Sequence, residues 1–519
     1  MSKCDAMHCD TEPSADHTNP NTSEVDGVEC EARLELKVMG ISKAEEPASE
    51  NVQSELGSSR VPRKRYVHLD LKGAPPRPAV LMQYLHLFAE WGATGVIFEW
   101  EDMLPYDGRL KVLRNPRCYS TSEVIAIVSA AEVAGLDVIP LVQTFGHLEF
   151  VLKHAEFEQY REDPNDILCL CPLTEGSQEL AKELIHQTLR FHPSAKYIHI
   201  GCDEVYSLGT CSRCSLQRHV SGAPTLFLDF VAPLVEECRS LGVHALLWHD
   251  MFENFPAELL QKRLADFADP VVWNYSNLSS IPPEAWRALS GAFKQVWGAS
   301  AFKGACEPDA IWVPVKQHVM NQLAWLDRAE RTDLHAIIIT GWSRFNHTAA
   351  LCEILPVAIP SLCICLTVWQ EGQYSEELRK AVYKRLGMWD ICEDLEDADL
   401  DEPSVRSFPG ADLISRVALL QEKRMSMVKI EELRRIFCPP FTSRANPSTW
   451  VRVRRQCESL VESLTILRPQ LFYALSQVLF PEDAQEFVNA KLDTVVDQAT
   501  ALQKEMEHLE VSGSHIHVR

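Results

Sequence analysis

The sequence predicts an α/β fold: a (β/α)8 barrel with a disordered N-terminal segment and an α-helical C-terminal domain. Eight short runs rich in β-branched and aromatic residues occur between Tyr66 and Trp342, and a segment long enough for a helix separates each from the next. Such alternation is typical of βαβ units, and eight units over roughly 280 residues fit a barrel. A doubly wound open sheet is the alternative, but Gly73-Ala-Pro-Pro76 after the first run is not a glycine-rich phosphate turn.

The predicted strands are spaced so that a crossover helix fits between neighbours. In chain order they are Tyr66–Leu71, Gly95–Trp100, Asp137–Gln143, the run that starts at Lys196, Val243–Trp248, Pro270–Asn274, Phe293–Trp297 and Leu334–Trp342. Apolar residues at helical spacing predict the intervening helices, among them Ala79–Trp91, Ser122–Ala134, Glu179–Phe191 and Leu226–Leu241.

Composition divides the chain into four parts. Residues 1–60 are rich in Ser, Glu, Asp, Asn and Pro and show no sustained period, so we expect a disordered acidic segment. Residues 61–372 hold the predicted catalytic barrel. Residues 373–510 contain long amphipathic stretches that predict a helical domain, which could also form a homodimer, and residues 511–519 form a frayed tail.

Charge and cysteine usage narrow the class of function. The 519 residues carry a formal net charge of −23, which argues against nucleic acid or an anionic membrane as a partner and suits a neutral substrate such as a sugar. The sequence shows neither a secretory signal nor a run of about 18 apolar residues. We therefore expect the 17 cysteines to be reduced thiols in the cytoplasm, and the basic triplet Arg63-Lys-Arg65 leaves the nucleus open.

The most informative stretch is Lys196–Tyr206, in which an apolar run leads into two adjacent carboxylates, Asp203 and Glu204. The run is typical of a strand that is buried on both faces. Burying ionised carboxylates is costly, and the C-terminal ends of barrel strands form the catalytic face. Solvated loop residues or a helix N-cap are the plain alternative. We expect an acid pair at the mouth of the barrel.

Aromatic residues gather at the predicted strand ends. Five of the twelve tryptophans occupy such positions: Trp100, Trp248, Trp273, Trp297 and Trp342. Indole rings stack on the C–H faces of a pyranose, while polar groups bind its hydroxyls. Any one of these tryptophans could be an ordinary core residue, but the set predicts a sugar site.

An adjacent Asp-Glu pair suits a glycosidase whose nucleophile belongs to the substrate. Enzymes with a protein nucleophile normally take their two carboxylates from separate strands, about 5 Å or more apart. His199-Ile-Gly-Cys-Asp203-Glu204 resembles the His-x-Gly-x-Asp-Glu signature of the β-N-acetylhexosaminidases of glycoside hydrolase family 20, and Trp342-Ser-Arg344 points to its hexosaminidase D-like branch. The resemblance covers about residues 62–370.

The resemblance implies a retaining exo-β-N-acetylhexosaminidase, in which the 2-acetamido oxygen of the substrate attacks the anomeric carbon. It implies that Asp203 orients the acetamide and stabilises its developing positive charge. Glu204 would act first as general acid and then as general base. Tyr275 would donate a hydrogen bond to the acetamide oxygen and so hold it for attack.

Further site residues are carried over from their positions relative to the strands. Those expected to bind the substrate or support the acid are Trp248, Trp297, Trp342, His147, Asp102, Glu101, Asp70, Arg65, Asn277 and Arg344. The three tryptophans would surround the acetamide methyl and the ring face. His147 would support the acid, with Asp102 or Glu101 as its own partner.

Three of these positions depart from the family pattern. Arg65 is followed by Tyr66 where the family has glycine, and Asn277 stands where the family has an aspartate. Arg344 occupies a position that is often glutamate in relatives. Because arginine donates hydrogen bonds where glutamate accepts them, we expect recognition of the sugar's O4 and O6 to differ.

Two other functions remain open at this point. One is a conventional glycosidase with Glu204 as acid and Asp250 as nucleophile. The other is a carbohydrate-binding protein that has lost turnover, although binding alone does not require a positioned acid.

Metal and cofactor chemistry is not expected from the sequence. Cys211-Ser-Arg-Cys214 and Cys169-x-Cys171 have ligand-like spacing. A structural zinc needs four ligands, however, and one pair of each kind in separate loops is a weak signal. His68-x-Asp70 is similar to a metal-hydrolase pattern, but no matching His pair follows at later strands.

Overall fold

Eight parallel strands close into a barrel in chain order, with β1 paired to β8. The computed structural model describes residues 62–276, 278, 281–388, 408–437 and 447–511. The strands are β1 Lys64–Asp70, β2 Gly95–Glu99, β3 Asp137–Leu141, β4 Tyr197–His199, β5 His244–Trp248, β6 Ala268–Trp273, β7 Trp297–Lys303 and β8 Ala336–Gly341. The predicted barrel is confirmed. The segment 1–60, predicted to be disordered, lies outside the described residues.

Helices surround the barrel between successive strands. They are α2 Pro78–Glu90, α3 Thr121–Val133, α4 Glu149–Leu152, α5 Ser177–Leu189, α6 Ser212–Ser221, α7 Ala223–Ser240, α8 Ala257–Arg263, α9 Pro283–Ala292, α10 Val315–Arg331, α11 Leu355–Glu371 and α12 Glu376–Arg385. Short turns η1 Glu101–Met103, η2 Gly108–Leu113 and η3 Ala155–Tyr160 lie in the loops after β2 and β3. None of the helices in the described ranges is long and apolar enough to cross a membrane.

One strand, β7, lies later in the chain than predicted. We expected it at Phe293–Trp297, but Phe293 ends α9 and the strand begins at Trp297. The strand contains Gly298-Ala-Ser-Ala301, small residues of low strand propensity. Packing requires them, because a Cβ on Gly298 would lie 2.7 Å from the ring of Trp325 in α10.

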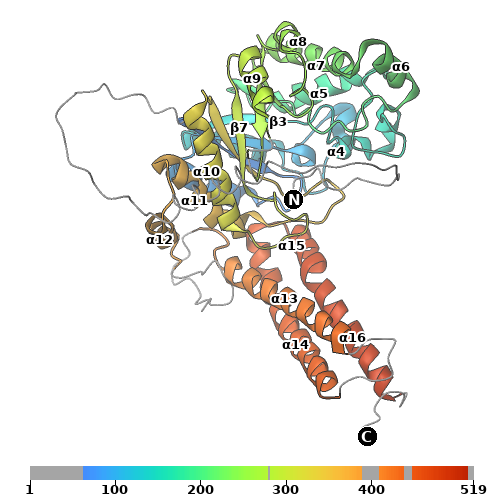
Figure 1. The fold of residues 1–519 in the computed structure, drawn as a ribbon, viewed down its shortest axis with the longest axis vertical. Coiled ribbons are helices and arrows are strands. Elements are labelled where there is room, and N and C mark those ends of the chain that lie inside the picture. Colours follow the sequence, from blue (N-terminus) through green and yellow to red (C-terminus); the bar gives the residue numbers. More distant parts are fainter. Residues whose placement is uncertain (1–61, 277, 279–280, 389–407, 438–446, 512–519) are drawn as a thin grey trace, which may run out of the picture.

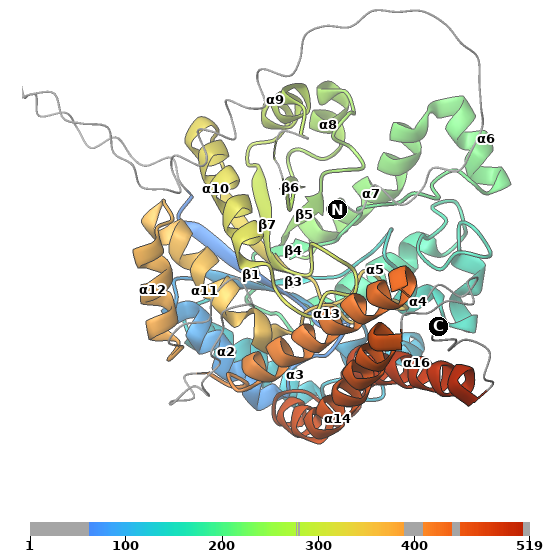
Figure 2. The same cartoon turned by 60° about the horizontal axis from the view of Figure 1, so that its bottom comes forward.

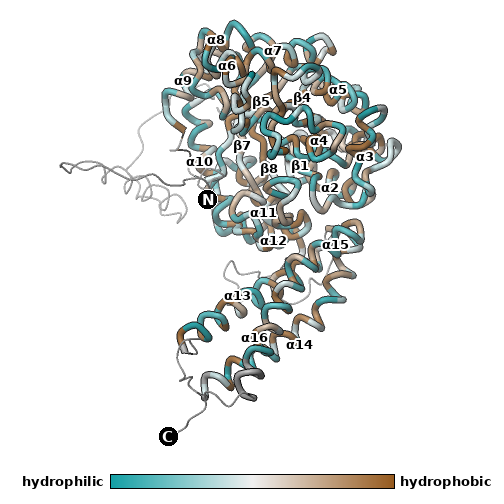
Figure 3. The backbone as a smooth tube through the Cα atoms, turned by 90° about the vertical axis from the view of Figure 1, so that its right-hand side faces the viewer, coloured by the Kyte–Doolittle hydropathy of each residue, from teal (hydrophilic) through white to brown (hydrophobic). Residues whose placement is uncertain are grey.

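The C-terminal helices form an arm that extends away from the barrel (Figures 1 and 3). The arm consists of α13 Leu413–Phe437, α14 Pro447–Val478, α15 Pro481–Val488, the π-helical turn η5 Asn489–Asp493 and α16 Thr494–Val511. Helices α13 and α14 lie side by side, and α16 packs along α14 (Figure 2). Bidentate pairing of Arg468 with Asp493, at 2.8 and 2.9 Å, ties α14 to η5.

The base of this arm rests on the loops that follow the barrel strands. Arg77, after β1, donates its backbone N–H to the carbonyl of Val478 at 2.7 Å. Arg117, after β2, pairs with the buried Asp483 at 2.7 Å. The C-terminal helices therefore contact the end of the barrel where the strands deliver their last residues.

Candidate active site

The loop after β4 directs the two adjacent carboxylates toward the same site. Ile200 still pairs with β5, through its N–H to Leu246 O at 2.9 Å. Beyond it, Cys202 and Glu204 adopt left-handed conformations, with φ of +69° and +48°. Each such non-glycine residue costs on the order of 1–3 kcal/mol, and such strain clusters at functional sites. The turns remove the alternation that would send Asp203 and Glu204 to opposite faces of a strand.

His147 lies between the two acids. Its Nε2 is 3.1 Å from Glu204 Oε2 and 3.4 Å from Asp203 Oδ2. Burial by itself would lower the pKa of His147, but the charge of Asp203 and hydrogen bonds to Asp203, Glu149 and Glu204 outweigh it and raise the pKa well above its ordinary value. The ring is therefore an imidazolium at neutral pH, and it holds Asp203 and Glu204 side by side.

The partner of His147 differs from the sequence expectation. Its Nδ1 faces Glu149 Oε1 at 4.0 Å, at the start of α4. Asp102, one expected partner, accepts a hydrogen bond from Asn115 Nδ2 at 3.0 Å. Glu101, the other, pairs with His347 and lies 3.6 Å from Lys72 Nζ. The sequence reasoning missed Glu149 because it begins a helix two residues after His147 rather than ending a strand.

Asp250, after β5, holds the acid loop in place. Its Oδ2 accepts the backbone N–H of Glu204 at 2.9 Å, and its Oδ1 accepts Trp273 Nε1–H at 3.0 Å. Burial, followed by the charge of Asp203, raises the pKa of Asp250 to about 7. Through these two hydrogen bonds Asp250 positions the backbone of Glu204 and the ring of Trp273.

Aromatic rings line the C-terminal end of the barrel beside the acids. Trp248 and Trp342 lie with ring centroids 6.0 Å apart. Tyr275 lies 6.3 Å from Trp342 and stacks on Trp273 at 5.4 Å. Trp248 Nε1 is buried without a hydrogen-bond partner among the described residues, so it could donate to a ligand. Trp273 belongs to this cluster, although the predicted binding set did not include it.

The hydroxyl group of Tyr275 stays protonated in this environment. Burial, with further contributions from the charges of Asp203 and Glu204, raises its pKa well above the ordinary value. Its hydroxyl can therefore serve as a hydrogen-bond donor. Asn277, two residues further on, lies outside the described residues.

Trp297 does not join the aromatic cluster, and its predicted role in the acetamide box is wrong. It begins β7 instead of ending it, so it lies at the opposite end of the barrel. There its ring packs against Tyr66, Tyr197 and His335 at centroid distances of 5.3, 5.2 and 5.2 Å. The error in the position of β7 caused this misplacement.

Arg65 also lies away from the acids. It is the second residue of β1, and its Nε donates to the carbonyl of Gly92 at 2.8 Å, in the turn that precedes β2. Arg65, where the sequence departs from the family's Arg-Gly pair, therefore stabilises the N-terminal end of the barrel. We withdraw Arg65 from the substrate site.

Asp70 ends β1 and fixes the loop that follows β8. Its Oδ2 accepts the backbone N–H of Ser343 at 2.8 Å and lies 2.7 Å from Lys72 Nζ. Its side chain is fully buried, so Asp70 supports the backbone next to Trp342. The ammonium of Lys72 lies 5.3 Å from the centroid of the Trp342 ring. Lys72 was missed, although its place directly after the first strand was a signal.

Arg344 connects the site to the C-terminal arm. Its Nη1 donates to Ala349 O at 2.7 Å, and its Nη2 lies 2.6 Å from the carboxylate of Glu486 in α15. Its guanidinium is thus held by protein groups, one of which is the carboxylate of Glu486. No local pattern could have found Glu486, because 142 residues separate the pair.

Comparisons with known proteins identify the family of this chain. Residues 88–279 match the family described as "Glycosyl hydrolase family 20, catalytic domain". The chain is 35% identical over 463 residues to a Homo sapiens protein named Hexosaminidase D, covering 86% of this chain and 94% of that one. A Bos taurus protein of the same name is 39% identical over 335 residues, covering 62% and 97%.

Among solved structures, a β-N-acetylhexosaminidase from Streptomyces coelicolor superposes with a TM-score of 0.47 at 13% identity, covering 63% of this chain and 69% of that one. The two mammalian relatives decide the assignment: the chain belongs to glycosyl hydrolase family 20 and is a glycoside hydrolase.

Proposed function

We propose that this glycoside hydrolase is an exo-β-N-acetylhexosaminidase that removes terminal, non-reducing N-acetylglucosamine or N-acetylgalactosamine from glycans or glycoconjugates. The observation that supports it most is the adjacent pair Asp203 and Glu204, held together against the imidazolium of His147. Asp250, the candidate protein nucleophile, instead holds the backbone of Glu204 and the indole of Trp273. An adjacent acid pair of this kind suits a reaction whose nucleophile is the acetamide of the substrate.

The first step forms a bond between the acetamide oxygen and the anomeric carbon. The glycosidic bond breaks at the same carbon, and its oxygen takes a proton from Glu204. Asp203 accepts the acetamide N–H and stabilises the positive charge of the resulting oxazolinium. Water then attacks the anomeric carbon and gives a proton to Glu204, while the bond between that carbon and the acetamide oxygen breaks and restores the acetamide, so the product retains the β configuration.

The aromatic residues hold the acetamide for this attack. Tyr275 donates its hydroxyl hydrogen to the acetamide oxygen, and Trp248 and Trp342 enclose the methyl group and the ring face. Lys72 and the Arg344–Glu486 pair lie at the rim next to Trp342, where they can contact sugar hydroxyls.

Turnover of paired aryl glycosides tests this function. We expect hydrolysis of the aryl N-acetyl-β-glucosaminide or galactosaminide, and a rate for the matching aryl β-glucoside or galactoside that is lower by orders of magnitude, because these lack the nucleophile. Comparable rates on both substrate types would favour the conventional glycosidase. Folded protein without turnover on any of them would favour a carbohydrate-binding protein.

Compartment and assembly are further parts of the proposal. We infer a cytoplasmic and nuclear location from the cysteines, since those within the described ranges are all free. We also infer a homodimer through the C-terminal arm, where Val428, Ile466 and Tyr473 are 61%, 59% and 68% exposed. Cell fractionation and light scattering of the purified chain test these two points. Neither nucleic acid nor a membrane is proposed as a partner.

A further inference from the structure

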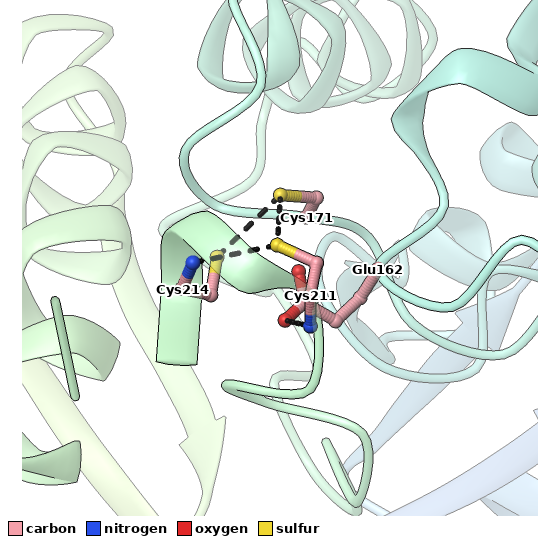
Figure 4. A group of neighbouring side chains, drawn as sticks. All are labelled: Glu162, Cys171, Cys211 and Cys214. Carbon is pink, nitrogen blue, oxygen red and sulfur yellow. Dashed lines mark hydrogen bonds between the residues drawn. The ribbon is translucent and has the colours of Figure 1, made fainter. Parts of the chain in front are cut away.

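Three cysteines and one glutamate meet beside the catalytic loops (Figure 4). Cys171 and Glu162 lie in the long loop between β3 and α5, while Cys211 and Cys214 lie at the start of α6. One ligand atom from each of the four residues lies within 4.8 Å of all the others. The metal signal in the sequence was weak because the two cysteine pairs lay in separate loops. Folding brings Cys171 of the first pair next to both cysteines of the second pair, Cys211 and Cys214.

The sulfur atoms are spaced as in a thiolate metal site. Cys171 Sγ lies 3.5 Å from Cys214 Sγ and 3.8 Å from Cys211 Sγ. Tetrahedral zinc with Zn–S bonds of about 2.3 Å places its sulfurs about 3.8 Å apart. Cys211 and Cys214 also have the C-x2-C spacing that places two thiolates at the start of a helix.

Glu162 supplies a fourth ligand of the right kind. The residue is 1% exposed. Its Oε1 accepts the backbone N–H groups of Gly209 and Cys211, both at 3.0 Å. Its Oε2 is buried without a well-formed hydrogen bond in the described part of the chain, and the groups that face the carboxylate are the thiols of Cys171, Cys211 and Cys214. A thiol is a weak hydrogen-bond donor, whereas a cation bound by the thiolates would satisfy this buried oxygen.

We propose that Cys171, Cys211, Cys214 and Glu162 bind one zinc ion. Four protein ligands close the coordination sphere, so the ion is structural rather than catalytic. The thiols lose their protons to solvent when the metal binds, and no electron is transferred.

The ion would join the two loops that carry the catalytic groups. The loop after β3 contributes His147 as well as Cys171, and the loop after β4 contributes Glu204 as well as Cys211. Cys169, two residues before Cys171, lies with its Sγ 3.9 Å from the carbonyl oxygen of Glu204. The zinc therefore stabilises the contact between His147 and Glu204 without touching the substrate.

Metal analysis of the full chain, purified with reductant and without chelator or a metal-affinity tag, tests the proposal. We expect about one zinc per chain by mass spectrometry. After exchange with cobalt, we expect the visible bands of tetrahedral Co²⁺ and a thiolate-to-cobalt charge-transfer band. Substoichiometric metal together with no such spectrum after cobalt addition would overturn the site. A Cys171–Cys214 disulfide in metal-free protein handled with thiol-blocking reagent would overturn it as well.

Cysteine variants locate the ion. Cys171→Ser and Cys211→Ser should lose the zinc and the charge-transfer band. Cys118→Ser, at a free thiol after β2, and Cys169→Ser, in the same loop as Cys171, should keep both. Full zinc content in Cys171→Ser and Cys211→Ser would contradict the assignment. If these two variants do not fold, the zinc content and cobalt spectrum of the unaltered chain decide.

Discussion

Asp250 illustrates how a buried carboxylate can serve catalysis without reacting. It accepts one hydrogen bond from the backbone of Glu204 and another from Trp273, and so fixes the acid relative to the aromatic cluster. Burial and, after it, the charge of Asp203 raise its pKa to about 7, so its surroundings disfavour the ionised form. A carboxylate nucleophile would have to react in that ionised form.

Replacing Asp250 by Asn turns an amide N–H group toward one of the two donors. We expect kcat/KM to fall by about 10- to 100-fold, the equivalent of about 1–3 kcal/mol for a broken buried hydrogen bond. We also expect the unaltered enzyme to remain unlabelled by a 2-fluoro sugar with a good leaving group, as read by intact mass. A stable adduct on Asp250 would show that this residue is the nucleophile.

His147 sets the electrostatics of the acid pair. Its raised pKa means that the protein gains interaction energy from the imidazolium, which is present at neutral pH and lost as the pH rises through the folded-state pKa. The imidazolium therefore holds the side chains of Asp203 and Glu204 together below that pKa.

Replacing His147 by Gln keeps a hydrogen-bond donor but removes this charge. We expect kcat/KM to fall at neutral pH, where the unaltered enzyme carries the imidazolium, and the difference between the two proteins to shrink as the pH rises through the folded-state pKa of His147. The measurement is the pH dependence of kcat/KM for the variant beside that of the unaltered enzyme, and identical profiles would exclude electrostatic support by His147.

Most of the candidate site could be predicted where residues follow a strand closely. Asp203, Glu204 and Trp248 could be placed in this way, since the ends of parallel barrel strands meet at one face. His147, further into the loop after β3, could be predicted only from the family resemblance. Glu149 and Glu486 reach the site from helices, and their positions depend on tertiary packing that leaves no periodic signal in the sequence.

At the scale of elements, the contact between the loops after β3 and β4 determines the geometry of the acids. Gly146 lies in the first loop, directly before His147, against the backbone of the second. An added Cβ at Gly146 would lie 2.1 Å from the carbonyl oxygen of Asp203. The loops can approach this closely only because position 146 has no side chain.

Replacing Gly146 by Ala must therefore separate the two loops. We expect kcat to fall more than tenfold, since a shift of about 1 Å at reacting groups can cost 100-fold, while the far-ultraviolet circular dichroism is kept. Gly291→Ala in α9 is the matched control, because nothing lies within 4 Å of its added Cβ. Equal activity of the two variants would contradict the role of the loop contact.

Strand prediction succeeded where side chains are branched and failed where packing demands small ones. The run at β8, Ala336–Gly341, is rich in isoleucine, and its prediction at 334–342 holds within a few residues. Strand β7 instead contains small residues under α10, and the adjacent aromatic-rich run was mistaken for it. Because of this error, Trp297 was expected at the C-terminal end of the barrel strands, whereas it lies at the opposite end.

At the scale of the whole molecule, the C-terminal arm completes the rim of the site. Helix α15 reaches two loops of the catalytic face, through Asp483 to Arg117 and through Glu486 to Arg344. The sequence indicated helices in this region, but their contact with the site depends on pairs that are 366 and 142 residues apart.

Glu486→Gln weakens this connection without removing the side chain. We expect a roughly two- to fivefold rise in KM with little change in kcat, the equivalent of about 0.5–1 kcal/mol for a partly exposed ion pair. Glu482→Gln, at an exposed position of the same helix, should leave both constants unchanged. Steady-state kinetics on the aryl N-acetylhexosaminide distinguish the two, and identical KM values would show that the arm does not shape the site.

Inhibition by N-acetylglucosamine- and N-acetylgalactosamine-thiazoline tests the central claim most directly. These compounds imitate the oxazolinium that forms only when the acetamide is the nucleophile. We predict competitive inhibition of the aryl N-acetylhexosaminide reaction far below KM, by the thiazoline of the preferred epimer, and its loss in Asp203→Asn. Efficient turnover without thiazoline inhibition would contradict substrate-assisted hydrolysis by Asp203 and Glu204.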